Sequence, residues 1–334
     1  MIMVKQSWKK KGFIDEPIDK NICLHHEIRK MCEEKNAVIL AHYYTNSDIQ
    51  DVADFIGDSL ALAQWAAMTD ADIIVMCGVH FMGETNKILC PDKKVLVCDL
   101  NAGCSLADSC KAEDLRLFKE QHPGYKVVSY VNTTADVKAL SDVVVTSSNA
   151  KMVIDSYPEE EKLIFGPDKN LGNYINSVTG REMLLWNGGC HVHGQFSLEG
   201  ILKLKEEHPM AKLLVHPECP KPIQIIADVI GSTAGLLKFA LTDEATEYIV
   251  ATESGILHQM RNKCPQKHFI PAPPEASEQI GCSCNECEYM KLNTMQKLYN
   301  TLKYEWPEII VDKDISDLAV KPIEKMLEIS KNLK

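Results

Sequence analysis

The sequence of 334 residues lacks several features that would point to particular classes of protein. It has no apolar run near the roughly 18 residues that a membrane-spanning helix needs, so no membrane partner is expected. The lysine-rich N-terminus lacks the apolar segment of a secretory signal, which favours a cytoplasmic location. The 36 lysines and arginines are outnumbered by 47 aspartates and glutamates and form no long basic stripe, so no nucleic-acid partner is expected either.

The sequence has instead an ordinary globular composition and many cysteines. Hydrophobic residues make up 45% and charged residues 25%, and the length leaves room for two or three domains with a sizeable core. The 13 cysteines cannot all pair within the chain, and in a reducing compartment they should be thiols, some of them metal ligands. Because the net charge is −11, an anionic substrate would have to be held by backbone N–H groups, helix N-termini or a metal.

A pattern of polar residues occurs three times at a nearly constant spacing. It is anchored at His42, Tyr130 and His216, which are 88 and then 86 residues apart. The other members of the pattern, in chain order within each copy, are Tyr44, Asp54 and Ser59, then Asn132, Asp142 and Ser147, then Glu218, Asp228 and Thr233. A fixed internal period predicts repeated structural units. Polar groups at matching places in three units also suggest three similar walls around one central site.

Each copy contains four short apolar runs, which predict parallel strands buried on both faces. The runs cover residues 37–40, 55–56, 73–76 and 95–97, then 127–130, 143–145, 163–165 and 183–185, then 213–215, 229–230, 248–250 and 269–270. Intervening stretches such as 60–68 and 235–240 suit crossover helices of right-handed βαβ units. We therefore predict an α/β protein of three similar αβα three-layer domains with short parallel sheets, arranged with pseudo-threefold symmetry around a central site.

We expect three domains, at residues 1–115, 116–200 and 201–334. The first includes an N-terminal extension, and the third ends in a helical tail that could pack against the first repeat. Open parallel sheets bind ligands beyond the carboxyl ends of their strands, where the anchors and the three hydroxyl residues fall. The alternative is that an aspartate and a hydroxyl residue after a strand only cap the next helix. Three copies in register favour a binding site.

Three cysteines stand in loops after the fourth apolar run of successive copies. Cys104, Cys190 and Cys287 follow the shared aspartates of their copies by 50, 48 and 59 residues, and the first two come directly after glycine. Three converging thiolates could hold zinc or three irons of a 4Fe-4S cluster, whose open fourth iron can act as a Lewis acid. A rival interpretation groups Cys287 with Cys282 and Cys284 in a local zinc site or a redox disulfide.

Eight segments together resemble the quinolinate synthase family, the A protein of the bacterial NAD pathway. They are 41–44 (AHYY), 53–60 (ADFIGDSL), 78–85 (GVHFMGET), 165–171 (FGPDKNL), 190–193 (CHVH), 216–219 (HPEC), 230–235 (IGSTAG) and 287–294 (CEYMKLNT). The resemblance covers about residues 36–295 and implies one 4Fe-4S cluster per chain, held by Cys104, Cys190 and Cys287. The chain departs from many members in the single residue between Cys282 and Cys284, whose roles the resemblance leaves open.

The family reaction is a transferase-type condensation of iminoaspartate with dihydroxyacetone phosphate to quinolinate, phosphate and two waters in de novo NAD biosynthesis. L-aspartate oxidase or aspartate dehydrogenase would be the functional partner that supplies iminoaspartate. Two alternatives stay open: a hydro-lyase or aldolase that acts on small di-acids with the same cluster, and a zinc-bound structural module or redox sensor without activity.

The chemistry of two anionic substrates suggests roles for the repeated residues. The hydroxyls of Ser59, Ser147 and Thr233, with nearby backbone N–H groups, suit carboxylate and phosphate oxygens. The remaining predicted substrate-binding residues are His42, Tyr130, Asn132, His216 and Glu218, and the predicted catalytic residues are Glu218, Tyr44, His42, His216 and His193. Glu218 is the expected general base, with a pKa raised by partial desolvation, unless it only belongs to the first turn of a helix. Tyr44 is expected near the open iron, and His193 beside the Cys190 loop or the substrate.

Overall fold

The structure, a computed structural model, describes residues 4–275 and 285–331 and contains three sheets of four parallel strands each. The strands are β1 (Ala37–His42), β2 (Phe55–Gly57), β3 (Ile73–Cys77) and β4 (Lys94–Val97), then β5 (Lys126–Tyr130), β6 (Val143–Val145), β7 (Leu163–Gly166) and β8 (Leu184–Leu185), then β9 (Lys212–Val215), β10 (Val229–Ile230), β11 (Glu247–Ala251) and β12 (His268–Pro271). Within each sheet the first strand lies between the second and the third, and the fourth lies on the other side of the third. The predicted α/β class and the apolar runs proposed as strands are confirmed.

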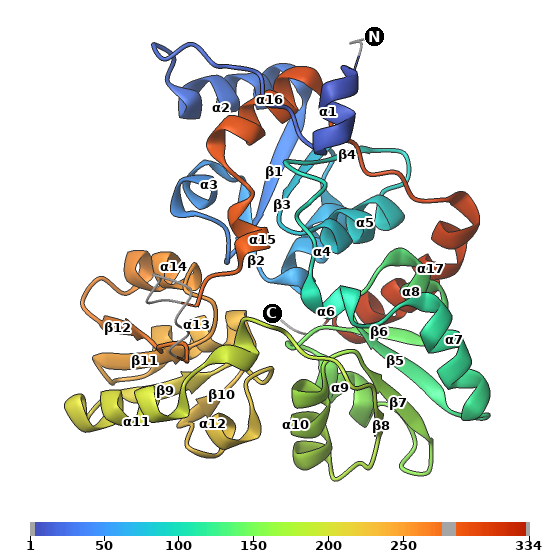
Figure 1. Cartoon of the computed structure of the whole chain (residues 1–334), viewed down its shortest axis with the longest axis vertical. Helices are drawn as coiled ribbons and strands as arrows, with labels where there is room; N and C mark the ends of the chain where they lie inside the picture. Colours follow the sequence, from blue (N-terminus) through green and yellow to red (C-terminus); the bar gives the residue numbers. More distant parts are fainter. Residues whose placement is uncertain (1–3, 276–284, 332–334) are drawn as a thin grey trace.

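Four helices alternate with the four strands of each repeat. They are α2 (Leu24–Lys35), α3 (Ser47–Val52), α4 (Ser59–Met68) and α5 (His80–Leu89), then α7 (Ala112–Gln121), α8 (Ala135–Ala139), α9 (Ala150–Asp155) and α10 (Lys169–Thr179), then α11 (Leu198–Glu207), α12 (Lys221–Ile225), α13 (Thr233–Thr242) and α14 (Ile256–Lys263). Figure 1 shows the three resulting lobes around a common centre. The chain thus consists of three similar αβα domains, while their boundaries and their pseudo-threefold relation stay predictions.

The repeated aspartates fix the first two strands of each sheet to one another. Each carboxylate accepts the backbone N–H of a residue in the first strand, at 2.7 Å for Asp54, 2.8 Å for Asp142 and 2.7 Å for Asp228. The N–H of each aspartate returns a bond to the carbonyl of that same residue. These aspartates lie at the amino end of the second strand and do not line the central cavity described below. Their repetition therefore serves the sheet, not the site, and it is not helix capping either.

The three sheets share an inner core and have separate outer cores. Leu40, Val128 and Leu214, from the first strand of each sheet, belong to one continuous buried cluster. The residue that precedes each of them belongs to a different outer cluster, because successive side chains of a strand point to opposite faces. Burial on both faces explains why the apolar runs do not alternate with polar residues.

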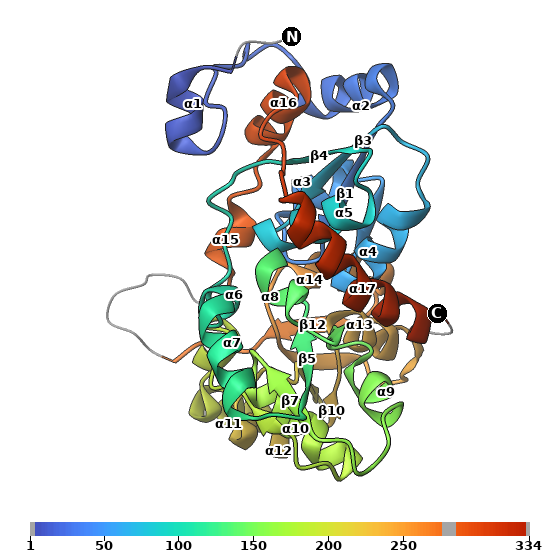
Figure 2. The same ribbon diagram turned by 90° about the vertical axis from the view of Figure 1, so that its right-hand side faces the viewer.

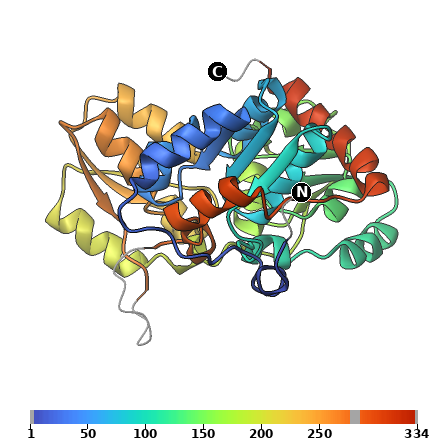
Figure 3. The same cartoon turned by 90° about the horizontal axis from the view of Figure 1, so that it is seen from above.

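The C-terminal segment returns to the first repeat and reaches the second. Helix α16 (Met295–Tyr304) packs against α2, as Figure 3 shows from above. Helix α17 (Lys313–Ile329) packs against α5, α8 and β6, and Figure 2 shows it crossing this side of the molecule. Short elements complete the fold: α1 (Gln6–Lys11), α6 (Ser105–Asp108), the 3₁₀ helix η1 (His193–Gln195) and α15 (Glu288–Lys291). No helix in the described part of the chain has the length and apolarity to cross a membrane.

Replacing Asp142 with alanine tests the role of the repeated aspartate. The variant leaves the Val127 N–H without its acceptor, so we expect the free energy of unfolding to fall by about 1–2 kcal/mol in a urea titration. The control is Asp155→Ala, which removes an exposed carboxylate paired with Lys151. This control should change the free energy of unfolding by less than about 0.5 kcal/mol. Equal stability of the two variants would contradict a structural role for Asp142.

Candidate active site

The carboxyl ends of the strands in all three sheets open onto one cavity. It encloses about 720 Å³, part of which is open to solvent. Every site residue predicted from the sequence lines it: His42, Tyr44, Ser59, Cys104, Tyr130, Asn132, Ser147, Cys190, His193, His216, Glu218, Thr233 and Cys287. The structure therefore brings the predicted residues together, and the contacts around each one indicate what it can do.

Each of the three cysteines lies shortly before a short helix at the cavity wall. Cys104 directly precedes α6 and Cys287 directly precedes α15, while Cys190 lies three residues before η1. Burial raises the pKa of the Cys104 thiol to about 12 and that of Cys287 to about 11. Burial, followed by the neighbouring Glu218 and the other two thiols, raises the pKa of Cys190 well above its usual value. Three thiols so placed would ionise only with a compensating cation among them, as metal binding provides.

The donor set fits an iron–sulfur cluster with one open iron. Three soft sulfur ligands reach the same cavity, one from each repeat, and no fourth cysteine lines it among the described residues. Polar side chains from all three repeats line the same cavity beside apolar ones such as Phe81 and Met290, which suits a site that also admits a substrate beside the metal. Cys282 and Cys284, which the rival interpretation needs, lie outside the described residues.

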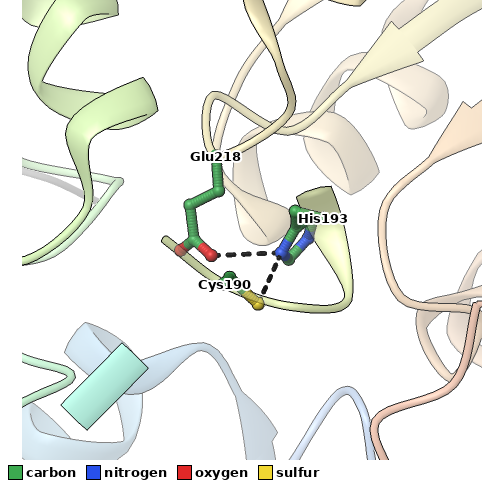
Figure 4. Close-up of side chains that lie close together, drawn as sticks. All are labelled: Cys190, His193 and Glu218. Atoms are coloured by element: carbon green, nitrogen blue, oxygen red, sulfur yellow. Dashed lines mark hydrogen bonds and ion pairs between the residues drawn. The ribbon is translucent and has the colours of Figure 1, made fainter. Parts of the chain in front are cut away.

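A second arrangement of possible metal ligands joins Cys190, His193 and Glu218 (Figure 4). The Nδ1 atom of His193 lies 3.4 Å from the Cys190 sulfur and 3.0 Å from a Glu218 carboxylate oxygen. Ligand atoms from the three residues all lie within 4.8 Å of one another. A single zinc ion could be bound by one sulfur, one imidazole nitrogen and one carboxylate oxygen. This grouping was not predicted from the sequence as a metal site.

Two of the repeat anchors are neutral histidines of fixed tautomer. The Nδ1 atom of His42 accepts the Tyr44 N–H at 3.2 Å, and that of His216 accepts the Glu218 N–H at 3.3 Å. Burial lowers the pKa of both imidazoles to about 3. Because Nδ1 serves as an acceptor, the proton lies on Nε2, and each ring is a hydrogen-bond donor and not a base.

Glu218 lies in the loop before α12 and is buried in contact with several donors. Its carboxylate accepts the Tyr130 hydroxyl at 2.5 Å and lies 3.0 Å from His193. Burial pushes the pKa of Glu218 upward, but the neighbouring His193 and the hydrogen bond from the Tyr130 hydroxyl outweigh burial and hold the pKa below its usual value. The expectation of a raised pKa is therefore wrong for this state, because that expectation counted desolvation without the donors. The helix-turn alternative is also wrong, since α12 begins at Lys221.

A chain of hydrogen bonds crosses the cavity wall from Glu218 to Thr233. His193 Nε2 lies 3.0 Å from the Thr252 hydroxyl, which is 2.7 Å from the Tyr44 hydroxyl. The Tyr44 hydroxyl is also 2.7 Å from that of Thr233. The chain joins residues of all three repeats and places Tyr44 at the cavity, while its expected position near an open iron stays a prediction. Thr252 was not predicted because it directly follows the third strand of its repeat, where the other two repeats have Gly78 and Pro167.

Two of the three predicted hydroxyl residues occupy helix starts without capping them, while Ser147 lies in the turn before α9. Helices α4 and α13 begin at Ser59 and Thr233, and their caps are the preceding residues, Asp58 and Ser232. The Ser148 hydroxyl lies 2.5 Å from the Asp58 carboxylate and 2.8 Å from the Ser232 hydroxyl. This contact joins the three repeats and leaves the hydroxyls and N-termini of two ten-residue helices at the cavity, which favours bound anions.

The depressed pKa of His42 predicts a pH dependence of stability. Below pH 6.5 the unfolded chain takes up a proton on His42 that the folded chain excludes until about pH 3, so stability falls as the pH falls through this window. Each such histidine contributes a slope of up to about 1.4 kcal/mol per pH unit.

In His42→Asn we expect a shallower slope of unfolding free energy against pH, measured on metal-free protein between about pH 4 and 6. The slope should fall by up to about 1.4 kcal/mol per pH unit, which is the contribution of one proton. The asparagine oxygen can still accept the Tyr44 N–H. His25→Asn, at an exposed position, serves as the control and should keep the wild-type slope. An identical slope for His42→Asn and wild type would show that His42 is not held neutral.

Comparison with known proteins extends the likeness over most of the chain. A family model described as quinolinate synthetase A protein (NadA) matches residues 26–328. The quinolinate synthase of Chloroherpeton thalassium is 52% identical over 317 residues, which cover 95% of this chain and 98% of that protein. The quinolinate synthase of Nostoc punctiforme is 54% identical over 303 residues, which cover 91% and 92% of the two chains. The resemblance noted in the motifs is confirmed, and the chain belongs to the quinolinate synthase family.

Proposed function

We propose that this protein condenses iminoaspartate with dihydroxyacetone phosphate to quinolinate, phosphate and two waters, as a cytoplasmic transferase of de novo NAD biosynthesis. L-aspartate oxidase or aspartate dehydrogenase would supply iminoaspartate. What supports the proposal most is that three cysteines and ten polar residues, all from the repeat pattern or its loops, line the same cavity. Membership in the family adds independent support from sequence.

Cys104, Cys190 and Cys287 would hold a 4Fe-4S cluster, one per chain. When bound, such a cluster supplies an open iron that acts as a Lewis acid toward a hydroxyl or carboxylate oxygen. The condensation involves no net redox change, so electron transfer is not required of the site. The remaining chemistry, which is binding, orientation and proton movement, is assigned to side chains that line the cavity.

Both substrates are anions, and the cavity offers neutral donors for them in a protein of net charge −11. The N–H groups at the starts of α4 and α13, with the hydroxyls of Ser59 and Thr233, suit phosphate and carboxylate oxygens. The Nε2–H groups of His42 and His216 add two donors that carry no charge. Ser147, Asn132 and Tyr130 add further polar side chains to the wall. Donors fixed by the fold orient the substrates with little reorganisation.

Glu218 is the proposed group for proton transfer. Its low pKa keeps it ionised at neutral pH, so it can accept a proton, although weakly. An anionic substrate beside it would raise its pKa by repulsion between like charges, which would make it a stronger base once the substrate is bound. Tyr130 and His193, both bonded to the carboxylate, hold it in one orientation and are placed to exchange the proton.

Metal content and product formation test the cluster proposal directly. Protein purified without oxygen should contain about four irons and four sulfides per chain and should form quinolinate from the two substrates. Cys190→Ala should lose both the cluster and the activity, whereas Cys264→Ala, a buried cysteine outside the cavity, should keep both. A fully active Cys190→Ala enzyme would refute the ligand assignment.

The role of Glu218 is tested by a variant of nearly the same shape. Glu218→Gln should retain the cluster, seen in its visible spectrum, while turnover falls about a hundredfold or more because the proton acceptor is lost. Glu247→Gln removes a carboxylate that contacts His208 and His268 away from the cavity, and its turnover should match wild type. Near-normal turnover of Glu218→Gln with the cluster intact would contradict the assignment of Glu218 as the proton acceptor.

The grouping of Cys190, His193 and Glu218 favours one competing function, a mononuclear zinc site. In that case the anaerobic protein would contain about one tightly bound zinc and show no visible absorbance. A cluster-bearing hydro-lyase or aldolase would contain iron but would form no quinolinate from the two substrates. One metal analysis combined with one product assay therefore separates the three possibilities.

A further inference from the structure

Two buried carboxylates hold the backbone of two of the cavity cysteines. An oxygen of Asp168 accepts the N–H of Cys190 at 3.2 Å, and an oxygen of Glu253 accepts the N–H of Cys287 at 3.1 Å. Both acidic residues are fully buried. Neither belongs to the repeat pattern noticed in the sequence, and neither is needed for the binding and proton transfer described above.

The two acids occupy equivalent places in their repeats. Asp168 follows the end of β7 by two residues, and Glu253 follows the end of β11 by two residues. The pairing of these strands with β5 and β9 matches in register, since Ser129 pairs with Gly166 and Val215 pairs with Ala251. An acid in this position faces the loop that follows the fourth strand, which is the loop that carries the cysteine.

In the first repeat the equivalent position is Val79, which has no polar side chain. The loop of Cys104 is tied there by a backbone bond instead, from the His80 N–H to the Ala102 carbonyl at 2.7 Å. All three cysteine loops are thus held from the end of the third strand, but only the second and third repeats use a carboxylate. In the third repeat the carboxylate of Glu253 is also paired with the ammonium of Lys291.

Glu253 is part of a clamp that fixes the start of α15. One of its oxygens accepts the Gly255 N–H at 2.7 Å, and the other lies 2.9 Å from the Lys291 ammonium. Lys291 ends α15, the short helix that Cys287 precedes, and its ammonium also donates to the Tyr44 carbonyl at 2.8 Å. The carboxylate therefore holds α15 at both ends, and the lysine joins it to the wall of the first repeat.

A buried carboxylate is tolerated only when it is paired and hydrogen-bonded, and Glu253 meets both conditions. Removing its charge would leave Lys291 without its partner and would free the Cys287 backbone to shift. Outer groups of this kind orient metal ligands, and their loss lowers metal affinity about 10–100-fold. They also set the local charge, so removing a negative group near a cluster raises its reduction potential.

We propose that Glu253, paired with Lys291, is a positioning residue that holds Cys287 in the geometry required to bind the metal centre. Its side chain borders the cavity, but the role assigned to it is exerted through the backbone N–H of Cys287 and through Lys291. The inference rests on the proposed cluster, because its subject is the third ligand of that cluster.

The test compares the cluster-loaded wild-type enzyme with Glu253→Gln, both purified without oxygen. We expect the rate of iron loss to the chelator bathophenanthroline disulfonate to rise about 10–100-fold in Glu253→Gln. We also expect the reduction potential of the cluster to move upward, which a loss of general stability would not cause. Lys291→Met should likewise speed iron loss, and Lys291→Arg should restore most of the retention because the ion pair is kept.

Asp243→Asn is the matched control. It removes a carboxylate of the same repeat that pairs with Lys212 at 2.5 Å and contacts no cysteine, so iron retention and potential should stay at wild-type values. If Glu253→Gln does not fold, judged by far-ultraviolet circular dichroism, Lys291→Met decides the outcome. Wild-type iron retention in the folded variants would overturn this inference alone. A wild-type chain without iron would instead overturn the proposed function on which the inference rests.

Discussion

The parallel direction of the strands in each sheet is the constraint on which the whole site depends. Parallel pairing sends every carboxyl end of a sheet to the same edge, and the three sheets turn those edges toward one cavity. The aspartate that joins the first two strands of each sheet supports this arrangement without lining the cavity itself. Residues that are distant in sequence can then meet, such as Tyr44, His193 and Thr252.

The electrostatics of the cavity follow from burial and from the partners that each buried group has. His42 and His216 stay neutral because each ring accepts a backbone N–H and is cut off from water. Glu218 stays charged because hydroxyl and imidazole donors surround it. Desolvation disfavours the charged form of all three groups, and only the carboxylate has partners that stabilise its charge enough to offset it. The uncharged donors of the cavity suit substrates that bring their own negative charge, and Glu218 is the carboxylate among them to which we assign proton transfer.

Whether the role of a residue could be predicted from the sequence depended on what that residue does in the fold. The anchors, the hydroxyl residues and the three cysteines could be found from the sequence, because a polar residue repeated after a buried strand is seldom required by the strand itself. The aspartates of the same pattern were misleading, since a residue repeated for the sheet looks the same in sequence as one repeated for a site. Asp168, Glu253 and Thr252 were missed because they follow the third strands, where the first repeat has no matching polar residue.

The sequence by itself determined the class of fold, the three repeats and the residues that reach the site, because apolar runs and their spacing specify strands and crossovers locally. It also determined the family, through motifs spread over most of the chain. Only the tertiary structure decided the charge state of Glu218, the tautomers of His42 and His216 and the clamp on Cys287. Those properties depend on desolvation and on contacts between repeats, and both arise only when segments far apart in the chain are packed together.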